Sequence, residues 1–176
     1  MKLGLLFGSF DPIHNGHLEI IQKALISAEC DEVWLIVQPF NFYKSGLAAS
    51  FADRTAMARL ATQKIEKVGV YELDPMFTAS HSIFATLKEL KRQDKSRQLL
   101  LILGADLAQS LPNWEDYDEI LALCKIFEVE RSRQSISSGQ VKQRVADGQP
   151  ASDLTPQTVV EYIFEHGLYT RNKSRS

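Results

Sequence analysis

The chain has 176 residues, a mass of 19.9 kDa and a formal net charge of −2 at pH 7, from 20 Lys and Arg against 22 Asp and Glu. This length predicts one domain over residues 1–176 with a frayed tail at 171–176, and the 44% hydrophobic content is enough for a layered core. The near balance of charge excludes a broadly basic surface, so no nucleic-acid partner is expected. Phosphate chemistry would have to use individually placed groups.

The cysteines and the apolar runs of the sequence indicate in which cellular compartment the protein is expected. Cys30 and Cys124 are the only cysteines, and their spacing fits neither a disulfide framework nor a zinc cluster. The N-terminal apolar run stops at Gly8, too early for a signal segment, and no run approaches the length of a membrane span. We therefore expect a cytoplasmic protein that does not associate with a membrane.

Strand-like and helix-like segments alternate along the chain. In order, the patterns predict a strand over 3–7, a helix over 17–28, a strand over 33–37, a helix over 52–67, a strand over 68–73, a helix over 82–92, a strand over 99–103, a helix over 117–123, a strand over 125–129, and helices over 138–147 and 156–166. For the last helix, Thr155 is expected as the N-cap, Pro156 as the first helical residue and Gly167 as the residue past the end. The alternation predicts an α/β fold, a doubly wound parallel sheet of about five strands with C-terminal helices.

A parallel sheet binds ligands at the carboxyl ends of its strands, and the first such turn carries unusual residues. It runs Gly-Ser-Phe-Asp-Pro-Ile-His-Asn-Gly-His over 8–17. Its glycines allow close backbone approach, and His14 and His17 are spaced to face one anion at a helix start. Imidazole N–H groups can bind phosphoryl oxygens, most strongly as charge builds in a transition state. The alternative is an ordinary turn with Asp11 as the cap and two incidental histidines; neither a Walker A loop nor a Gly-x-Gly-x-x-Gly fingerprint is present.

The stretch 136–142, Ile-Ser-Ser-Gly-Gln-Val-Lys, is a second candidate. Ser137 and Gln140 have capping-box spacing, so the stretch begins a helix whether or not it also binds a phosphate.

The residues from Gly8 to His17 closely resemble the signature of the nucleotidyltransferase superfamily with the His-x-Gly-His motif. The resemblance implies a Rossmann-like fold and transfer of a nucleotidyl group from a nucleoside triphosphate to a phosphate- or phosphonate-bearing acceptor, with release of pyrophosphate. It implies that His14 and His17 hold the triphosphate and stabilise the in-line transition state. The nucleotide-binding turn would include Gly8, Ser9 and Phe10.

The stretch 136–142 resembles the superfamily's Ile-Ser-Ser-Thr-x-x-Arg motif, which implies that Ser137, Ser138 and Lys142 bind the triphosphate. Two residues depart from the pattern. Gly139 replaces a threonine, and Lys142 replaces an arginine, which keeps the charge but loses the bidentate fork.

Other segments resemble the bacterial nicotinate mononucleotide adenylyltransferases. Lys44-Ser45 and 51–57 resemble that family's lysine loop and Arg-x-x-Met helix, and Gly104-Ala105-Asp106 followed by Trp114 resembles its Gly-x-Asp…Trp stretch. The resemblance implies that Lys44 reaches the phosphates, that Gly104 and Asp106 meet the adenosine ribose, and that Trp114 stacks on a pyridine ring. A solvated loop lysine and a half-buried core aromatic are the alternatives for Lys44 and Trp114. Arg54 is expected to be structural, and His166 is expected to end a helix.

Three places depart from that family. Its Ser-Tyr-Thr segment is replaced around His81 and Ser82, which are expected to serve the acceptor pocket instead. Glu115 replaces an aromatic residue, and the stretch 130–134 is short. The identity of the acceptor is therefore the least determined part of the prediction.

The sequence predicts an adenylyltransferase that joins ATP to nicotinate mononucleotide for NAD biosynthesis. Mg²⁺ is expected on the ATP phosphates, with no dedicated protein metal site. One alternative is a relative that uses another small phosphate-bearing acceptor, such as 4′-phosphopantetheine. Another is a nucleotide-binding module without catalysis. The oligomeric state is left open, a homo-oligomer included.

Overall fold

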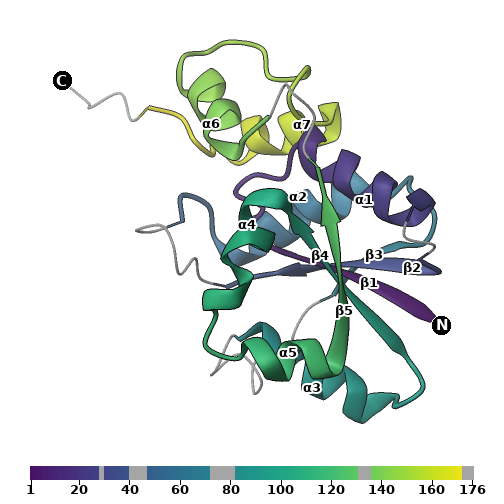
Figure 1. Ribbon diagram of the computed structural model, residues 1–176. Coiled ribbons are helices and arrows are strands. Elements are labelled where there is room, and N and C mark those ends of the chain that lie inside the picture. The colour runs from purple at the N-terminus through teal and green to yellow at the C-terminus, as the bar shows by residue number, and fades with distance from the viewer. Residues whose placement is uncertain (28–29, 40–46, 72–81, 131–135, 172–176) are drawn as a thin grey trace.

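The computed structural model describes residues 1–27, 30–39, 47–71, 82–130 and 136–171 (Figure 1). Its strands are β1 (Lys2–Gly8), β2 (Glu32–Val37), β3 (Val68–Tyr71), β4 (Gln98–Gly104) and β5 (Cys124–Val129). Its helices are α1 (Asn15–Ser27), α2 (Phe51–Thr62), α3 (Ile83–Gln93), α4 (Ala105–Ser110), the 3₁₀ helix η1 (Leu111–Asn113), α5 (Tyr117–Leu123), α6 (Ser138–Ala146) and α7 (Gln157–Glu165).

The strands form one parallel sheet in the order β3-β2-β1-β4-β5. Leu5 of β1 lies beside Trp34 of β2 on one side and Leu101 of β4 on the other. The chain builds outward from β1 in one direction and then returns to build outward from β4 in the other. The switch point between β1 and β4 is where such a sheet binds ligands. The predicted doubly wound α/β fold is confirmed.

Helices cover both faces of the sheet (Figure 1). Side chains alternate along β1, so Leu3 and Leu5 pack on one face while Leu6 packs on the other. Helices α1 and α2 cover the Leu6 face, and α6 and α7 pack outside them and add side chains to the same core; α3 and α5 cover the Leu3 face (Figure 1). We call the side chains packed on the Leu6 face the first core, and those packed on the Leu3 face the second core. The first core contains side chains of the C-terminal helices α6 and α7 together with Phe10 and Ile13 of the turn after β1.

Two local predictions were wrong, and two short helices were not predicted. The predicted helix over 52–67 ends at Thr62, because the chain must reverse into β3 and Lys67 adopts a φ of +62° in that reversal. The segments α4 and η1 were not predicted, because six- and three-residue helices are too short to show a helical period. Thr155 does not cap α7: Pro156 is the N-cap, and the Thr155 hydroxyl bonds elsewhere. Gly167 does follow the helix end, at a φ of +61°.

Within the described ranges, no helix combines the length and apolar character needed to cross a membrane.

Candidate active site

The turn after β1 is shaped by the packing of Phe10. Phe10 is buried and has a φ of +47°. A Cβ atom added at Gly8 would lie 2.9 Å from the Phe10 ring. Glycine is therefore required at the end of β1, because any side chain there would displace the aromatic ring that closes the turn.

The two histidines of the turn lie against each other. Their rings are stacked, with centroids 3.7 Å apart and an interplanar angle of 29°, and Phe10 packs edge-on to His17 at 5.0 Å. The backbone N–H of His14 donates to His17 Nδ1 at 3.2 Å. Because Nδ1 is the acceptor, the proton of a neutral His17 is on Nε2. A Cβ at Gly16 would lie 3.1 Å from the His14 ring, so this glycine keeps room for the pair.

Asp11 is a buried carboxylate with four hydrogen-bond donors. Oδ1 accepts from Ala49 N at 3.1 Å and from the Tyr169 hydroxyl at 2.8 Å. Oδ2 accepts from Ala48 N at 3.0 Å and from Lys142 Nζ at 3.1 Å. Burial alone would raise the pKa of Asp11, but the hydrogen bonds from Ala48, Tyr169 and Lys142 outweigh it and hold the pKa below its usual value. Asp11 is therefore an anion that joins distant segments, not the cap of α1.

Helix α6 packs its first turns against this region. The predicted capping box is confirmed: Ser137 Oγ accepts from Gln140 N at 3.3 Å, and Gln140 Oε1 accepts from Ser137 N at 2.7 Å. The Ser138 hydroxyl donates to the Pro12 carbonyl at 2.9 Å. One turn later, Lys142 is paired with Asp11 while its side chain keeps 35% exposure. The two predicted phosphate-binding stretches therefore lie side by side.

The segment before α7 holds the same turn from another side. Thr155 is fully buried, and its hydroxyl donates to the Ile13 carbonyl at 2.8 Å. Asn15 donates its backbone N–H to Leu154 O at 2.8 Å and its side-chain amide to Asp153 O at 3.1 Å. Sequence reasoning missed these contacts because each joins residues more than a hundred positions apart, and nothing local marks the partners.

Arg54 has the structural role predicted for it. Its guanidinium is buried and donates to the carbonyls of Ser9 at 2.6 Å, Gln38 at 2.7 Å and Pro39 at 3.1 Å. These carbonyls follow β1 and β2, so one side chain ties together the carboxyl ends of two neighbouring strands. His166 likewise lies where predicted, at the C-cap of α7.

The remaining predicted site residues are on other elements. Gly104 ends β4 and is the N-cap of α4, whose first turn contains Asp106. Ser82 caps α3, with its Oγ accepting from Ala85 N at 3.0 Å. Lys44 and His81 lie outside the described residues.

Trp114 follows η1 and packs with the second core, whereas Phe10 and Ile13 of the histidine turn belong to the first. Its indole N–H donates to Ser110 Oγ at 3.3 Å. This placement matches the half-buried core aromatic, and a role in stacking on substrate stays a prediction.

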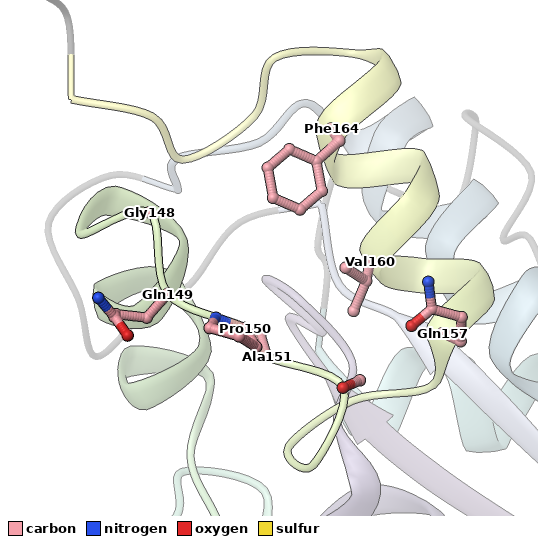
Figure 2. Close-up of a pocket in the computed structure, with 8 residues that line it drawn as sticks. Gly148, Gln149, Pro150, Ala151, Gln157, Val160 and Phe164 are labelled. Atoms are coloured by element: carbon pink, nitrogen blue, oxygen red, sulfur yellow. The ribbon is translucent and has the colours of Figure 1, made fainter.

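A hollow of about 290 Å³ lies apart from these residues, between the α6–α7 connection and α7 (Figure 2). Phe164, which is 58% exposed, and Val160 extend from α7 toward Pro150 and Ala151 (Figure 2). The other lining residues are Gly148, Gln149, Ser152 and Gln157. None of the predicted site residues lines this hollow.

In the part of the chain that the structure describes, no group of three or more His, Cys, Asp or Glu residues is placed to hold a metal ion. Cys30 and Cys124 are buried free thiols, and burial raises the pKa of Cys124 to about 11. Neither thiol is suited to act as a metal ligand or a nucleophile.

Comparisons with known proteins agree with this geometry. The family model described as cytidylyltransferase-like matches residues 5–163. The chain is 31% identical to a probable nicotinate-nucleotide adenylyltransferase of Halalkalibacterium halodurans, with 99% of this chain and 94% of that protein covered. It is 31% identical to the nicotinate-nucleotide adenylyltransferase of Bacillus subtilis, with 96% and 98% covered. Its fold is similar to the crystal structure of a putative nicotinate-nucleotide adenylyltransferase from Vibrio parahaemolyticus, with a TM-score of 0.80, 16% identity, and 97% and 96% of the two chains covered.

Proposed function

Since the chain belongs to the cytidylyltransferase-like family of nucleotidyltransferases, we propose that it is a nicotinate-nucleotide adenylyltransferase of NAD biosynthesis. It transfers AMP from ATP to nicotinate mononucleotide and releases pyrophosphate. The observation that carries this function is the stacked pair of His14 and His17 at the switch point, flanked by Ser138 and Lys142 of α6. The two stretches that resemble phosphate-binding motifs are distant in sequence and adjacent in space.

The proposed reaction is an in-line displacement. A phosphate oxygen of nicotinate mononucleotide attacks the α-phosphorus of ATP, the bond from the α-phosphorus to the bridging oxygen of the β-phosphate breaks, and pyrophosphate leaves with that electron pair. The acceptor is already an anion, so no protein nucleophile is needed and catalysis is positioning plus charge neutralisation. His17 Nε2–H and the His14 ring would donate to the phosphoryl oxygens as their charge increases.

The other predicted residues divide between the two substrates. The Lys142 ammonium bonds Asp11 with one of its three N–H groups, which leaves the others for a triphosphate. Proposed contacts to ATP also come from Gly8, Ser9, Phe10, Lys44, Gly104, Asp106, Ser137 and Ser138. Proposed contacts to the acceptor come from His81, Ser82 and Trp114.

Mg²⁺ is proposed to enter with the nucleotide. Asp11, the carboxylate of the turn over 8–17, already accepts four hydrogen bonds, so its oxygens are not available as metal ligands. Mg²⁺ commonly keeps water and substrate phosphates as ligands, and there it would neutralise phosphate charge. Because both cysteines are free thiols, the proposed place of action is the cytoplasm.

Pyrophosphate release from purified protein with ATP, Mg²⁺ and a panel of acceptors tests the proposal. We expect turnover with nicotinate mononucleotide, and a loss of about 10²–10³ in kcat for His17→Asn. His166→Gln is the control, because His166 also stacks on an aromatic ring but lies at the end of α7.

Two outcomes would replace the proposal. Turnover with 4′-phosphopantetheine but not with nicotinate mononucleotide would assign the chain to a different acceptor. ATP binding without pyrophosphate release from any acceptor would make it a nucleotide-binding module.

A further inference from the structure

We propose that Thr155 is a positioning residue for His17, acting through the peptide bond between Ile13 and His14. The inference rests on the proposed function, because it takes His17 as a group that acts on the triphosphate. Thr155 itself contacts neither substrate: it is fully buried just before α7, 142 residues away from the carbonyl that it bonds.

One peptide plane carries both hydrogen bonds. Its carbonyl, of Ile13, accepts from Thr155 Oγ1 at 2.8 Å, and its N–H, of His14, donates to His17 Nδ1 at 3.2 Å. The peptide group is rigid, so the hydroxyl that fixes the carbonyl direction also fixes the N–H direction. The His14 N–H determines how the His17 ring is turned. Because it occupies Nδ1 as an acceptor, it keeps the ring's own proton on Nε2. Hydrogen bonds in series also polarise each other, which strengthens the contact to the ring.

The Thr155 hydroxyl does not cap α7. The helix is capped at Pro156, whose carbonyl accepts from Val159 N at 2.9 Å and Val160 N at 3.1 Å. Removing the Thr155 hydroxyl therefore leaves the start of the helix unchanged.

The turn also keeps its other anchors when Thr155 changes. Asn15 remains bonded to Leu154 O and Asp153 O, and Ser138 remains bonded to Pro12 O. We therefore expect a variant that stays folded while the Ile13–His14 peptide is free to tilt.

The chain offers a matched control for the experiment. Thr62 is also buried, and its hydroxyl donates to a backbone carbonyl, Ala58 O, at 2.9 Å. That bond lies within α2, away from the histidine turn. Thr155→Val and Thr62→Val each delete one buried hydroxyl of the same kind, and Thr155→Ser restores the donor.

Steady-state transfer of AMP to nicotinate mononucleotide is measured for the three variants, beside their melting temperatures. We expect Thr155→Val to lower kcat by about ten- to a hundredfold with a smaller change in the KM for ATP, because a slightly misplaced group loses transition-state contacts first. Thr155→Ser should recover most of the rate, and Thr62→Val should keep it. Equal loss of rate in Thr155→Val and Thr62→Val, or no recovery in Thr155→Ser, would overturn the positioning role.

A second measurement does not depend on activity. The chain has four histidines, so their imidazole ¹⁵N NMR signals can be assigned one by one. We expect Thr155→Val to move the His17 Nδ1 signal toward that of a nitrogen without a hydrogen-bond donor, while His166 stays unchanged. An unmoved His17 signal would contradict the inference even in an active enzyme. An inactive wild type with a moved His17 signal would contradict only the proposed function.

Discussion

Asp11 shows how a buried charge is held at a site that must bind anions. Only 4% of the residue is exposed, yet it accepts from two backbone N–H groups, a hydroxyl and an ammonium. These donors replace the water that burial removes, which is the condition for keeping a carboxylate ionised inside a protein. A negative group so close to a proposed triphosphate site is tolerable because Lys142 offsets it.

Replacing Asp11 with Asn should destabilise the protein in a pH-dependent way. The folded-state pKa of Asp11 lies below its ordinary value of 3.8, so its contribution to stability is fully present above about that pH and is lost as pH falls through the lower, folded value. We expect Asp11→Asn to lower the free energy of unfolding by roughly 1–3 kcal/mol at pH 7. Urea unfolding at a series of pH values from 7 to 2 measures the difference, which should shrink only at the acid end. A difference that stays constant to pH 2 would contradict the assignment.

Tyr169 and Tyr162 form a natural comparison at the same scale. Each hydroxyl donates to an aspartate, Tyr169 to Asp11 at 2.8 Å and Tyr162 to Asp53 at 3.0 Å. Burial and the neighbouring Asp11 raise the pKa of Tyr169 far above its usual range, whereas Asp53 is a partly exposed residue at the start of α2. We expect Tyr169→Phe to cost about 1.5–3 kcal/mol in urea unfolding, and Tyr162→Phe about 0.5–1 kcal/mol. Equal losses would show that burial of the acceptor does not set the strength of these bonds.

At the scale of elements, periodicity and continuity predicted most of the secondary structure. The three central strands β1, β2 and β4 were found as continuous apolar runs, which is typical of strands buried on both faces. The edge strands β3 and β5 were also predicted, although their side chains are only partly buried, and α5 was predicted with its bounds. The end of α2 was missed because 63–67 carries helix-forming residues that the reversal into β3 overrides. The end of α2 is therefore determined by the connection to β3 and not by the helix propensity of the residues.

Replacing two helical glycines with alanine should change the stability of the protein in opposite directions. At Gly139 in α6 an added Cβ would meet only Ser137 Oγ, at 3.7 Å, whereas at Gly16 in α1 it would press on the His14 ring. Alanine is the better helix former, so Gly139→Ala should raise the free energy of unfolding by about 0.5–1 kcal/mol. Gly16→Ala should lower it despite the same gain in propensity, and should lower kcat as the His14 ring moves. Thermal unfolding of both variants gives the comparison; stabilisation by Gly16→Ala would contradict the packing described for the histidine pair.

At the scale of the molecule, the two cores share one sheet, but the tryptophans, whose fluorescence reports unfolding, lie only against the second core. Trp34 and Trp114 both pack with the second core, whereas α6 and α7 belong to the first. If residues 1–176 form one domain, as the length predicts, urea should unfold both cores together. Tryptophan fluorescence and far-UV circular dichroism should then give coincident transitions. Fluorescence that changes at lower urea than the helical signal would instead indicate two units.

The candidate site was predictable only where its residues are neighbours in sequence. The spacing of His14 and His17 and the capping box at Ser137 follow from local rules, and the structure has both. The contacts of Thr155 with Ile13 and of Tyr169 with Asp11 span 142 and 158 residues, and no local pattern specifies which carbonyl or carboxylate a distant hydroxyl will meet. Such contacts follow from how α6 and α7 return over the first turn, which only the fold determines.

That return has a consequence for a chain that is still being made. Synthesis proceeds from the N-terminus, and a domain folds as a unit only once its last segments have left the ribosome. When β5 emerges, all the strands are present, but Pro12, Ile13 and Asp11 still wait for Ser138, Lys142, Thr155 and Tyr169. A nascent chain that ends at β5 would therefore hold the histidine turn only through Arg54, Ala48 and Ala49. The first loop of this sheet is therefore the last to gain all of its contacts.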